Sequence, residues 1–292
     1  MFLSSFVVLA AGFPAAFFIA ALWFCSTTLS RMMRSMVFGP ERPFTLLHAH
    51  GERLSGLIHE TAGQPVGIYV PGFNATLNGH KAQLLAQTAQ RHGRSWIRYD
   101  PRGVGRSDGR FAAQTLSGGL ADLHLLLRFI APRPAVLVGS SMGGWLSVLA
   151  ASRWPARIHA LLLIAPAFNF IQDLYASLPQ SEREAWADTG TRRFSDHYGG
   201  PDYQLDFMLV KDAWRHDVLR WPPTLSCPVH ILHGAADEIV PPARSVQFAK
   251  AAGSPHVHLD ILPGADHRLS GEDAALIGAL DACWPEEDSL HV

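Results

Sequence analysis

The residues best suited to covalent chemistry form the run GSSMG at 139–143, which fits the pattern G-x-S-x-G. The strand-like run AVLV comes directly before it, and a helix-forming stretch comes directly after it. This context lifts the hydroxyl of Ser141 above a sheet and places the N–H of Met142 beside a forming oxyanion, while Gly139 and Gly143 relieve crowding in the turn. We therefore expect Ser141 to be a nucleophile. The alternative is a small-residue turn needed only for close helix packing.

A serine hydroxyl is a poor nucleophile without a base, and a base needs an orienting carboxylate. Both follow later in the chain, in the order carboxylate then histidine. Asp237 follows the strand-like run VHIL, and His267 follows the run VHLDIL. Glu238 and Asp266 are competing carboxylates, but Asp237 has the more favourable position after its strand. The sequence predicts that Ser141, Asp237 and His267 meet as a catalytic triad.

A second oxyanion donor is expected in the run PGFNA at 71–75, which follows the strand-like run VGIYV. The N–H of Phe73 is the candidate, because Gly72 allows the backbone to approach closely. The donor is a main-chain group, so the side chain of Phe73 is free to line an acyl pocket. The alternative is a turn that carries a core phenylalanine.

The elements that must position these residues are apolar runs of strand length that alternate with helix-length stretches. Such alternation predicts an α/β fold, with a mostly parallel eight-stranded sheet and helices on both faces. In sheets of this kind, ligands bind beyond the carboxyl ends of the strands. The predicted strands are Pro43–His50, Arg53–Thr61, Val66–Val70, Ser95–Asp100, Ala135–Val138, Ala160–Ile164, Val229–Leu232 and Val257–Leu262.

The stretch at about 169–224 breaks this rhythm. It contains no strand-like run, but it carries aromatic and aliphatic residues at helical spacing. We expect a small helical insertion over the ligand end of the sheet, which is a common place for a lid. The alternative is a spacer or an extra core helix.

The amino terminus differs from an ordinary soluble domain. Residues 6–25 carry no charge, and at about 1.5 Å per residue a helix of that length spans roughly 30 Å of hydrocarbon. Arg31 and Arg34 follow, so residues 1–35 are predicted to be a membrane anchor, with a catalytic domain at 36–292 on the cytoplasmic side. The alternatives are a cleaved signal peptide, or a true start at a later methionine and a cytoplasmic protein.

Composition excludes several classes of protein. The chain has 292 residues with 24 Lys and Arg against 25 Asp and Glu, and no run of like charge stands out. Clustered cations facing phosphates are therefore not expected, and neither is a nucleic-acid partner. Three scattered cysteines argue against a disulfide framework and against a zinc site built on paired CxxC motifs.

Two further patterns argue against a cofactor or a metal. The run RGVGRSDG at 102–109 places its third glycine one residue too late for a dinucleotide loop. The pairs His48/His50 and His256/His258 each share a strand face, but two histidines without a third ligand are expected to be surface or hydrogen-bonded residues. No cofactor and no metal site are predicted.

Together these motifs resemble the α/β-hydrolase superfamily over residues 44–280. A closer resemblance is to the mitochondrial palmitoyl-protein thioesterase and acyl-glucuronide esterase type and its bacterial relatives. It runs through PGFNATLNGHKA, RYDPRGVGRSDG, VGSSMGGWL, DLYASLPQSEREAW, CPVHILHGAADEIVP and GADHRLS. The resemblance implies a serine hydrolase that cleaves acyl esters or thioesters, acylated proteins included. Organelle import is not implied, since the apolar segment replaces a basic presequence.

Other activities remain open at this point. A C–C bond hydrolase of the meta-cleavage type uses the same triad on a similar elbow. A peptidase is less favoured, because no separate domain is present to gate peptides. A ligand receptor with slow turnover is the alternative outside enzymes.

Overall fold

The computed structural model describes residues 39–62, 65–196, 199–254 and 256–284. The chain divides into two units, Met1–Gly39 and Pro40–Val292, and every element below belongs to the second. The predicted anchor at residues 6–25 lies outside the described residues and stays a prediction. Among the helices that are described, none has the length and apolar character needed to cross a membrane.

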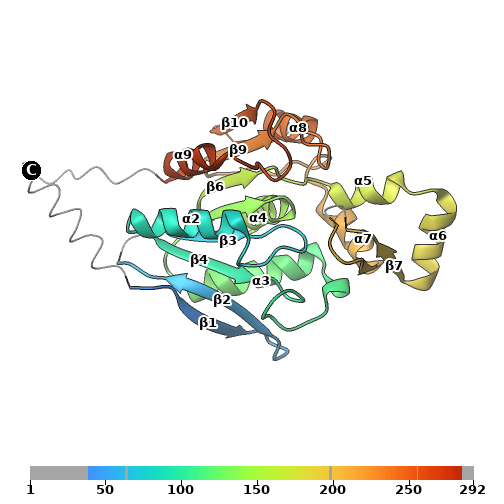
Figure 1. Cartoon of the computed structure of the whole chain (residues 1–292), viewed down its shortest axis with the longest axis horizontal. Coiled ribbons are helices and arrows are strands. Elements are labelled where there is room, and N and C mark those ends of the chain that lie inside the picture. Colours follow the sequence, from blue (N-terminus) through green and yellow to red (C-terminus); the bar gives the residue numbers. More distant parts are fainter. Residues whose placement is uncertain (1–38, 63–64, 197–198, 255, 285–292) are drawn as a thin grey trace, which may run out of the picture. The chain divides into compact units, whose positions relative to one another are not determined.

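Within the described residues, the main sheet has eight strands in the order β1-β2-β4-β3-β5-β6-β9-β10. The strand β2 pairs antiparallel with β1 and with β4, and the remaining pairs are parallel. The predicted α/β-hydrolase fold with a mostly parallel sheet is therefore confirmed (Figure 1). The strands are β1 (Arg42–Leu47), β2 (Arg53–His59), β3 (Val66–Val70), β4 (Ser95–Asp100), β5 (Ala135–Ser140), β6 (Ile158–Ile164), β9 (Val229–Gly234) and β10 (Val257–Leu262).

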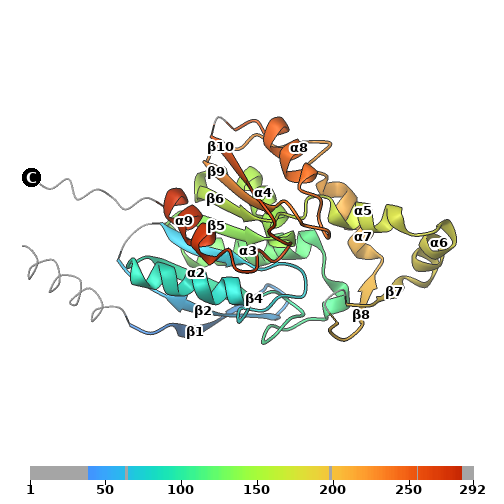
Figure 2. The same ribbon diagram turned by 45° about the horizontal axis from the view of Figure 1, so that its top comes forward.

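Helices cover both faces of this sheet, which explains why β3 and most of β5 read as continuous apolar runs. Every residue of β3, β4 and β5 is buried. One face packs against α2 (His80–Arg91) and α9 (Asp273–Cys283), whose apolar side chains form one core cluster with the sheet. The other face packs against α3 (Leu116–Phe129), α4 (Met142–Arg153) and α8 (Ala243–Ala251), in a larger cluster (Figure 2).

The insertion between β6 and β9 is helical only in part, so the prediction of no strand in it was wrong. It contains α5 (Phe170–Ser177), α6 (Gln180–Thr189) and α7 (Met208–Ala213), and it extends from one end of the sheet (Figure 1). It also contains an antiparallel pair, β7 (Thr191–Phe194) and β8 (Tyr203–Asp206). Strands of four residues are too short for a clear alternating pattern.

Aromatic packing holds this small pair of strands in place. Phe194 lies directly opposite Tyr203, and the two rings stack with centroids 5.9 Å apart. Phe194 also makes an edge contact with the buried Trp186 of α6 at 5.2 Å. The partner of each ring lies across a strand pair or on another element, so only the folded chain brings them together.

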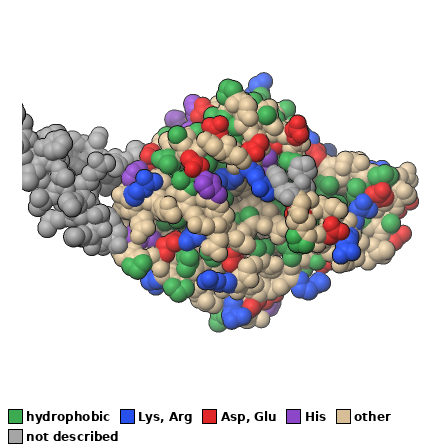
Figure 3. All heavy atoms as spheres, in the orientation of Figure 1, with side chains coloured by type: hydrophobic (Ala, Val, Ile, Leu, Met, Phe, Trp, Pro, Cys, Tyr) green, Lys and Arg blue, Asp and Glu red, His purple; other side chains and the backbone are tan. Residues whose placement is uncertain are grey.

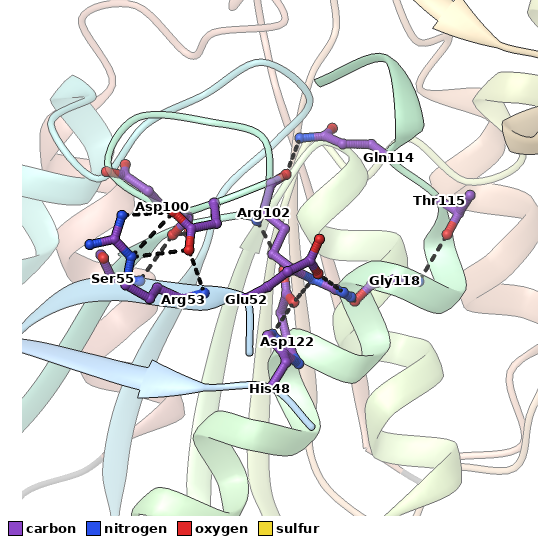
Figure 4. Close-up of polar contacts among 12 residues, drawn as sticks. His48, Glu52, Arg53, Ser55, Asp100, Arg102, Gln114, Thr115, Gly118 and Asp122 are labelled. Carbon is purple, nitrogen blue, oxygen red and sulfur yellow. Dashed lines mark hydrogen bonds and ion pairs between the residues drawn. The ribbon is translucent and has the colours of Figure 1, made fainter. Parts of the chain in front are cut away.

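The glycine-rich loop after β4 is held by a polar network (Figure 4). Arg102 donates to Asp122 at 2.6 Å, to Glu52 at 3.0 Å and to the carbonyl of Gly118 at 2.8 Å. Nε2 of His48 lies 2.9 Å from the same Asp122. The network ties the β1–β2 turn and α3 to the loop, and the loop leads into a short 3-10 helix. Over the face in Figure 3, cationic and acidic side chains are intermixed, in agreement with a sequence in which no run of like charge stands out.

Candidate active site

The turn from β5 into α4 holds Ser141 in an unusual backbone conformation. Its φ is 54° and its ψ is −121°, a region that side-chain-bearing residues rarely adopt. The flanking glycines leave no room for a side chain. A Cβ added at Gly139 would lie 2.3 Å from the carbonyl oxygen of Gly143. A Cβ added at Gly143 would lie 2.0 Å from the carbonyl oxygen of Val70. The main chain can therefore make this sharp turn only with glycine at both positions.

The structure brings the three predicted triad residues together. Nε2 of His267 lies 3.1 Å from Oγ of Ser141, and Nδ1 of His267 lies 2.7 Å from Oδ2 of Asp237. An ionised carboxylate only accepts hydrogen bonds, so Nδ1 carries the imidazole proton and Nε2 is free to accept the serine proton. This is the arrangement that general-base activation of a hydroxyl needs.

Asp237 is held rigidly by four donors. Oδ1 accepts from the backbone N–H groups of Ile239 at 2.9 Å and Val240 at 2.8 Å, while Oδ2 accepts from His267 and from His233. Burial alone would raise the pKa of Asp237, but the hydrogen bonds from His233, His267 and Val240 outweigh it and lower that pKa. The carboxylate is therefore ionised at neutral pH.

The competing carboxylates have other surroundings. Glu238 is exposed to solvent. Asp266 accepts hydrogen bonds from the backbone N–H and the hydroxyl of Ser270.

His233 belongs to this site and was missed in the sequence. Its side chain is fully buried, and its Nε2 lies 3.0 Å from both Asp237 and the carbonyl oxygen of Val240. Both neighbours are acceptors, so Nε2 is protonated and Nδ1 accepts from the hydroxyl of Ser245 at 2.7 Å. The signal was its place at the end of a strand, four residues before the predicted aspartate.

Phe73 and Met142, whose backbone N–H groups are the predicted oxyanion donors, line the same cavity as Ser141. The loop after β3 approaches the nucleophile closely, because a Cβ at Gly72 would lie 3.1 Å from Cβ of Ser141. The chain thus places two backbone segments beside the serine hydroxyl, one from β3 and one from α4.

Ser141 and His267 open into a cavity of about 670 Å³, within the usual range for small-molecule sites. The insertion supplies part of its wall. The ring of Tyr203 lies 5.6 Å from that of Phe73, and Phe170 of α5 also faces the cavity. Its apolar lining residues include Phe73, Met142, Phe170, Tyr203, Ile239 and Val240.

One rim of the cavity is basic, with Lys81 and Arg268 among its lining residues. Burial lowers the pKa of Lys81 to about 8, against the opposite effect of the nearby Asp266 carboxylate. Nζ of Lys81 donates to the carbonyl oxygen of Arg268 at 2.8 Å. A smaller hollow of about 180 Å³ shares Gly72 and Met142 with the main cavity.

Comparison with known proteins agrees with this geometry. The profile of the family described as serine aminopeptidase, S33, matches residues 68–198 and 213–274, which is more than half of the chain. The chain belongs to this family of α/β-hydrolases. It is a hydrolase by its fold, its family and its relatives. The stretch that the profile skips, residues 199–212, falls inside the insertion.

Individual relatives give a finer comparison. The mitochondrial palmitoyl-protein thioesterase ABHD10 of Rattus norvegicus is 34% identical over 248 residues, covering 85% of this chain and 80% of the relative. The structure of alpha/beta hydrolase domain-containing protein 10 from mouse superposes with a TM-score of 0.75 at 32% identity, covering 82% of this chain and 97% of that one. A hydrolase structure from Agrobacterium vitis S4 gives a TM-score of 0.79 at 28% identity, with 84% and 99% coverage. The predicted resemblance is confirmed.

Proposed function

We propose that this protein hydrolyses carboxylic esters or thioesters through an acyl-enzyme intermediate, with Ser141 as nucleophile, His267 as base and Asp237 as orienting carboxylate. The observation that carries the proposal is the continuous hydrogen-bonded series from Oγ of Ser141 through the imidazole to the carboxylate. It opens into a cavity of suitable size, in a chain whose relatives include named thioesterases.

The reaction follows from the geometry. Oγ of Ser141 attacks the acyl carbonyl carbon while Nε2 of His267 takes the hydroxyl proton, and Asp237 stabilises the imidazolium that forms. The N–H groups of Phe73 and Met142 receive the oxyanion of the tetrahedral intermediate. The carbon–oxygen or carbon–sulfur bond of the substrate then breaks, and His267 gives its proton to the leaving group.

The second half of the reaction uses the same groups. His267 takes a proton from water, whose oxygen attacks the acyl carbon of the ester formed with Ser141. Collapse of this second intermediate breaks the bond to Oγ and returns the proton to Ser141. The products are a carboxylic acid and the free enzyme, and no cofactor enters either half.

The cavity wall supports an apolar acyl group as substrate. Phe73, Phe170 and Tyr203 present aromatic surface beside Ser141, which suits aliphatic or aromatic acyl chains. The relatives are named for removing palmitoyl groups from proteins, so acylated proteins belong to the proposed substrates along with small acyl esters and thioesters. The insertion, predicted at 169–224, serves as the lid of this cavity.

A fluorophosphonate probe tests the nucleophile. Wild type and a Ser181→Ala control, which changes an exposed serine of α6, should be labelled, whereas Ser141→Ala should not. Equal labelling of Ser141→Ala would remove Ser141 from the mechanism. A second assay compares p-nitrophenyl esters, acyl-CoA and S-acyl peptides of increasing chain length.

The same substrate panel separates the other activities. Faster turnover of a meta-cleavage diketone than of any acyl ester would identify a C–C bond hydrolase. Preference for amide substrates would identify a peptidase. Stoichiometric acylation without steady turnover would identify a receptor.

We also propose that residues 1–35 attach the protein to a membrane and that the hydrolase domain begins near residue 36. Fractionation of cells that produce the chain with and without residues 1–34 tests this. Recovery of the full-length chain entirely in the soluble fraction would exclude the anchor.

A further inference from the structure

Three side chains with metal-binding atoms lie together on β9 and β10. These two strands form the sheet edge farthest from β1 (Figure 2). The two strands are parallel, and His258 is the direct register partner of His230. Asp260 follows His258 by two residues, so it points to the same face of the sheet. Neighbouring strands thus bring His230, His258 and Asp260 to one place.

The three side chains already contact one another. Nε2 of His230 lies 2.8 Å from Oδ2 of Asp260, and Nε2 of His258 lies 3.0 Å from Oδ1 of the same carboxylate. The two imidazole rings meet edge to face, with centroids 4.7 Å apart. One ligand atom from each residue lies within 4.8 Å of the other two.

Exposure leaves room for an ion and for its remaining ligands. The side chains of His258 and Asp260 are 66% and 41% exposed, whereas that of His230 is 13% exposed. The largely buried His230 anchors the group, and the two more exposed side chains can move to make room for an ion. Zinc bonds of about 2.0–2.2 Å in tetrahedral geometry hold ligand atoms roughly 3.3–3.6 Å apart, so the nitrogen–oxygen contacts of 2.8 and 3.0 Å must open slightly to admit the ion.

We propose that His230, His258 and Asp260 form a binding site for one divalent transition-metal ion, with Zn²⁺ as the reference ion. Two imidazole nitrogens and one carboxylate oxygen are a donor set that zinc prefers, and water completes the coordination. In the present contacts Nε2 of each histidine donates to the carboxylate of Asp260. Metal binding therefore requires the other neutral tautomer, with the proton on Nδ1, so that Nε2 offers its lone pair to the metal.

The sequence pattern did not predict this site, because it showed only the pair His256/His258. His230 comes from the adjacent strand, 28 positions before His258 in the chain. Only the register of β9 and β10 makes the two histidines neighbours. Asp260 lies in the run VHLDIL, which the sequence pattern predicts as a strand and not as part of a metal site.

A bound ion would link the edge strand to the body of the sheet. β9 leads to the loop of Asp237 and β10 leads to the loop of His267, so the link joins the two strands that precede these residues. A ligand that binds only the folded state raises thermal stability. At free Zn²⁺ about 100-fold above its dissociation constant, the Tm should rise by roughly 5–10 °C.

Calorimetric titration of chelator-treated protein without a histidine tag tests the proposal, with ZnCl₂ as the titrant. Wild type should bind one equivalent with a matching rise in Tm. His258→Gln and Asp260→Asn should each weaken binding at least about tenfold, since even outer partners of metal ligands are worth 10–100-fold. His50→Gln is the matched control, because it changes an exposed histidine in the β1–β2 turn at the opposite sheet edge.

The result can overturn the proposal in two ways. Equal Zn²⁺ binding by wild type and the His258→Gln/Asp260→Asn double variant would leave the three residues as a hydrogen-bonded clamp between strands. A loss of Zn²⁺ binding in His50→Gln as large as in the two ligand variants would assign the binding to scattered surface histidines. Neither readout uses hydrolase activity, so a failed metal site and a failed catalytic assignment are distinguishable.

Discussion

Asp237→Asn tests the hydrogen-bond geometry of the proposed triad most directly. The backbone N–H groups of Ile239 and Val240 donate to Oδ1 and hold that position for an acceptor. The amide oxygen of asparagine must therefore stay there, and its NH₂ group must take the place of Oδ2. That NH₂ group faces Nδ1 of His267, 2.7 Å away in the wild type, and it can only donate.

The consequence is a change of tautomer in His267. Nδ1 must lose its proton to accept from the amide, so the proton moves to Nε2, which faces Oγ of Ser141 at 3.1 Å. A protonated Nε2 cannot take the serine proton. We expect kcat to fall about 10⁴-fold, which corresponds to about 5.5 kcal/mol of barrier at about 1.36 kcal/mol per factor of ten.

The assay is steady-state hydrolysis of a p-nitrophenyl ester at neutral pH, with thermal unfolding to show that the variant folds. Glu238→Gln is the matched control, since it removes the adjacent exposed carboxylate and should leave kcat within about twofold of wild type. A loss of less than about tenfold in folded Asp237→Asn would show that this carboxylate does not set the tautomer. A large loss in Glu238→Gln would mean that the wrong carboxylate was assigned.

Three further predictions concern stability. Gly143→Ala places a Cβ 2.0 Å from a carbonyl oxygen of β3, so thermal unfolding should show a loss of at least about 2 kcal/mol, or roughly 4–8 °C in Tm; an unchanged Tm would contradict the tight turn. Thr115→Ala removes the cap that accepts from the N–H of Gly118 at 3.0 Å and should cost about 1 kcal/mol, whereas Thr115→Ser should retain stability in urea unfolding. Hydrogen bonds from Arg53 lower the pKa of Asp108 to about 2, so its contribution is present above the unfolded-state pKa of about 4 and is lost as the pH falls toward 2. Urea midpoints measured from pH 5 to pH 2 should therefore fall less steeply in Asp108→Asn than in wild type, and parallel curves would refute this.

Much of the fold was predictable from the sequence, because its signals are local. Strand-length apolar runs bounded by turn residues identified the eight strands of the main sheet, and the strand–turn–helix context of Ser141 identified the elbow. Asp237 and His267 were predictable for a related reason. Each follows a strand directly, and the carboxyl ends of parallel strands meet at one edge.

The tertiary structure alone decided the features that depend on neighbours in space. His233 supports the carboxylate from within a buried strand, and its role follows only from the positions of Val240 and Ser245 around its ring. The short strands of the insertion pair in a register that places Phe194 opposite Tyr203, where the two rings stack. A linear pattern records what each residue is and what precedes it. Packing and strand register decide which side chains share a face, and the free energy of those contacts is gained only when distant segments meet.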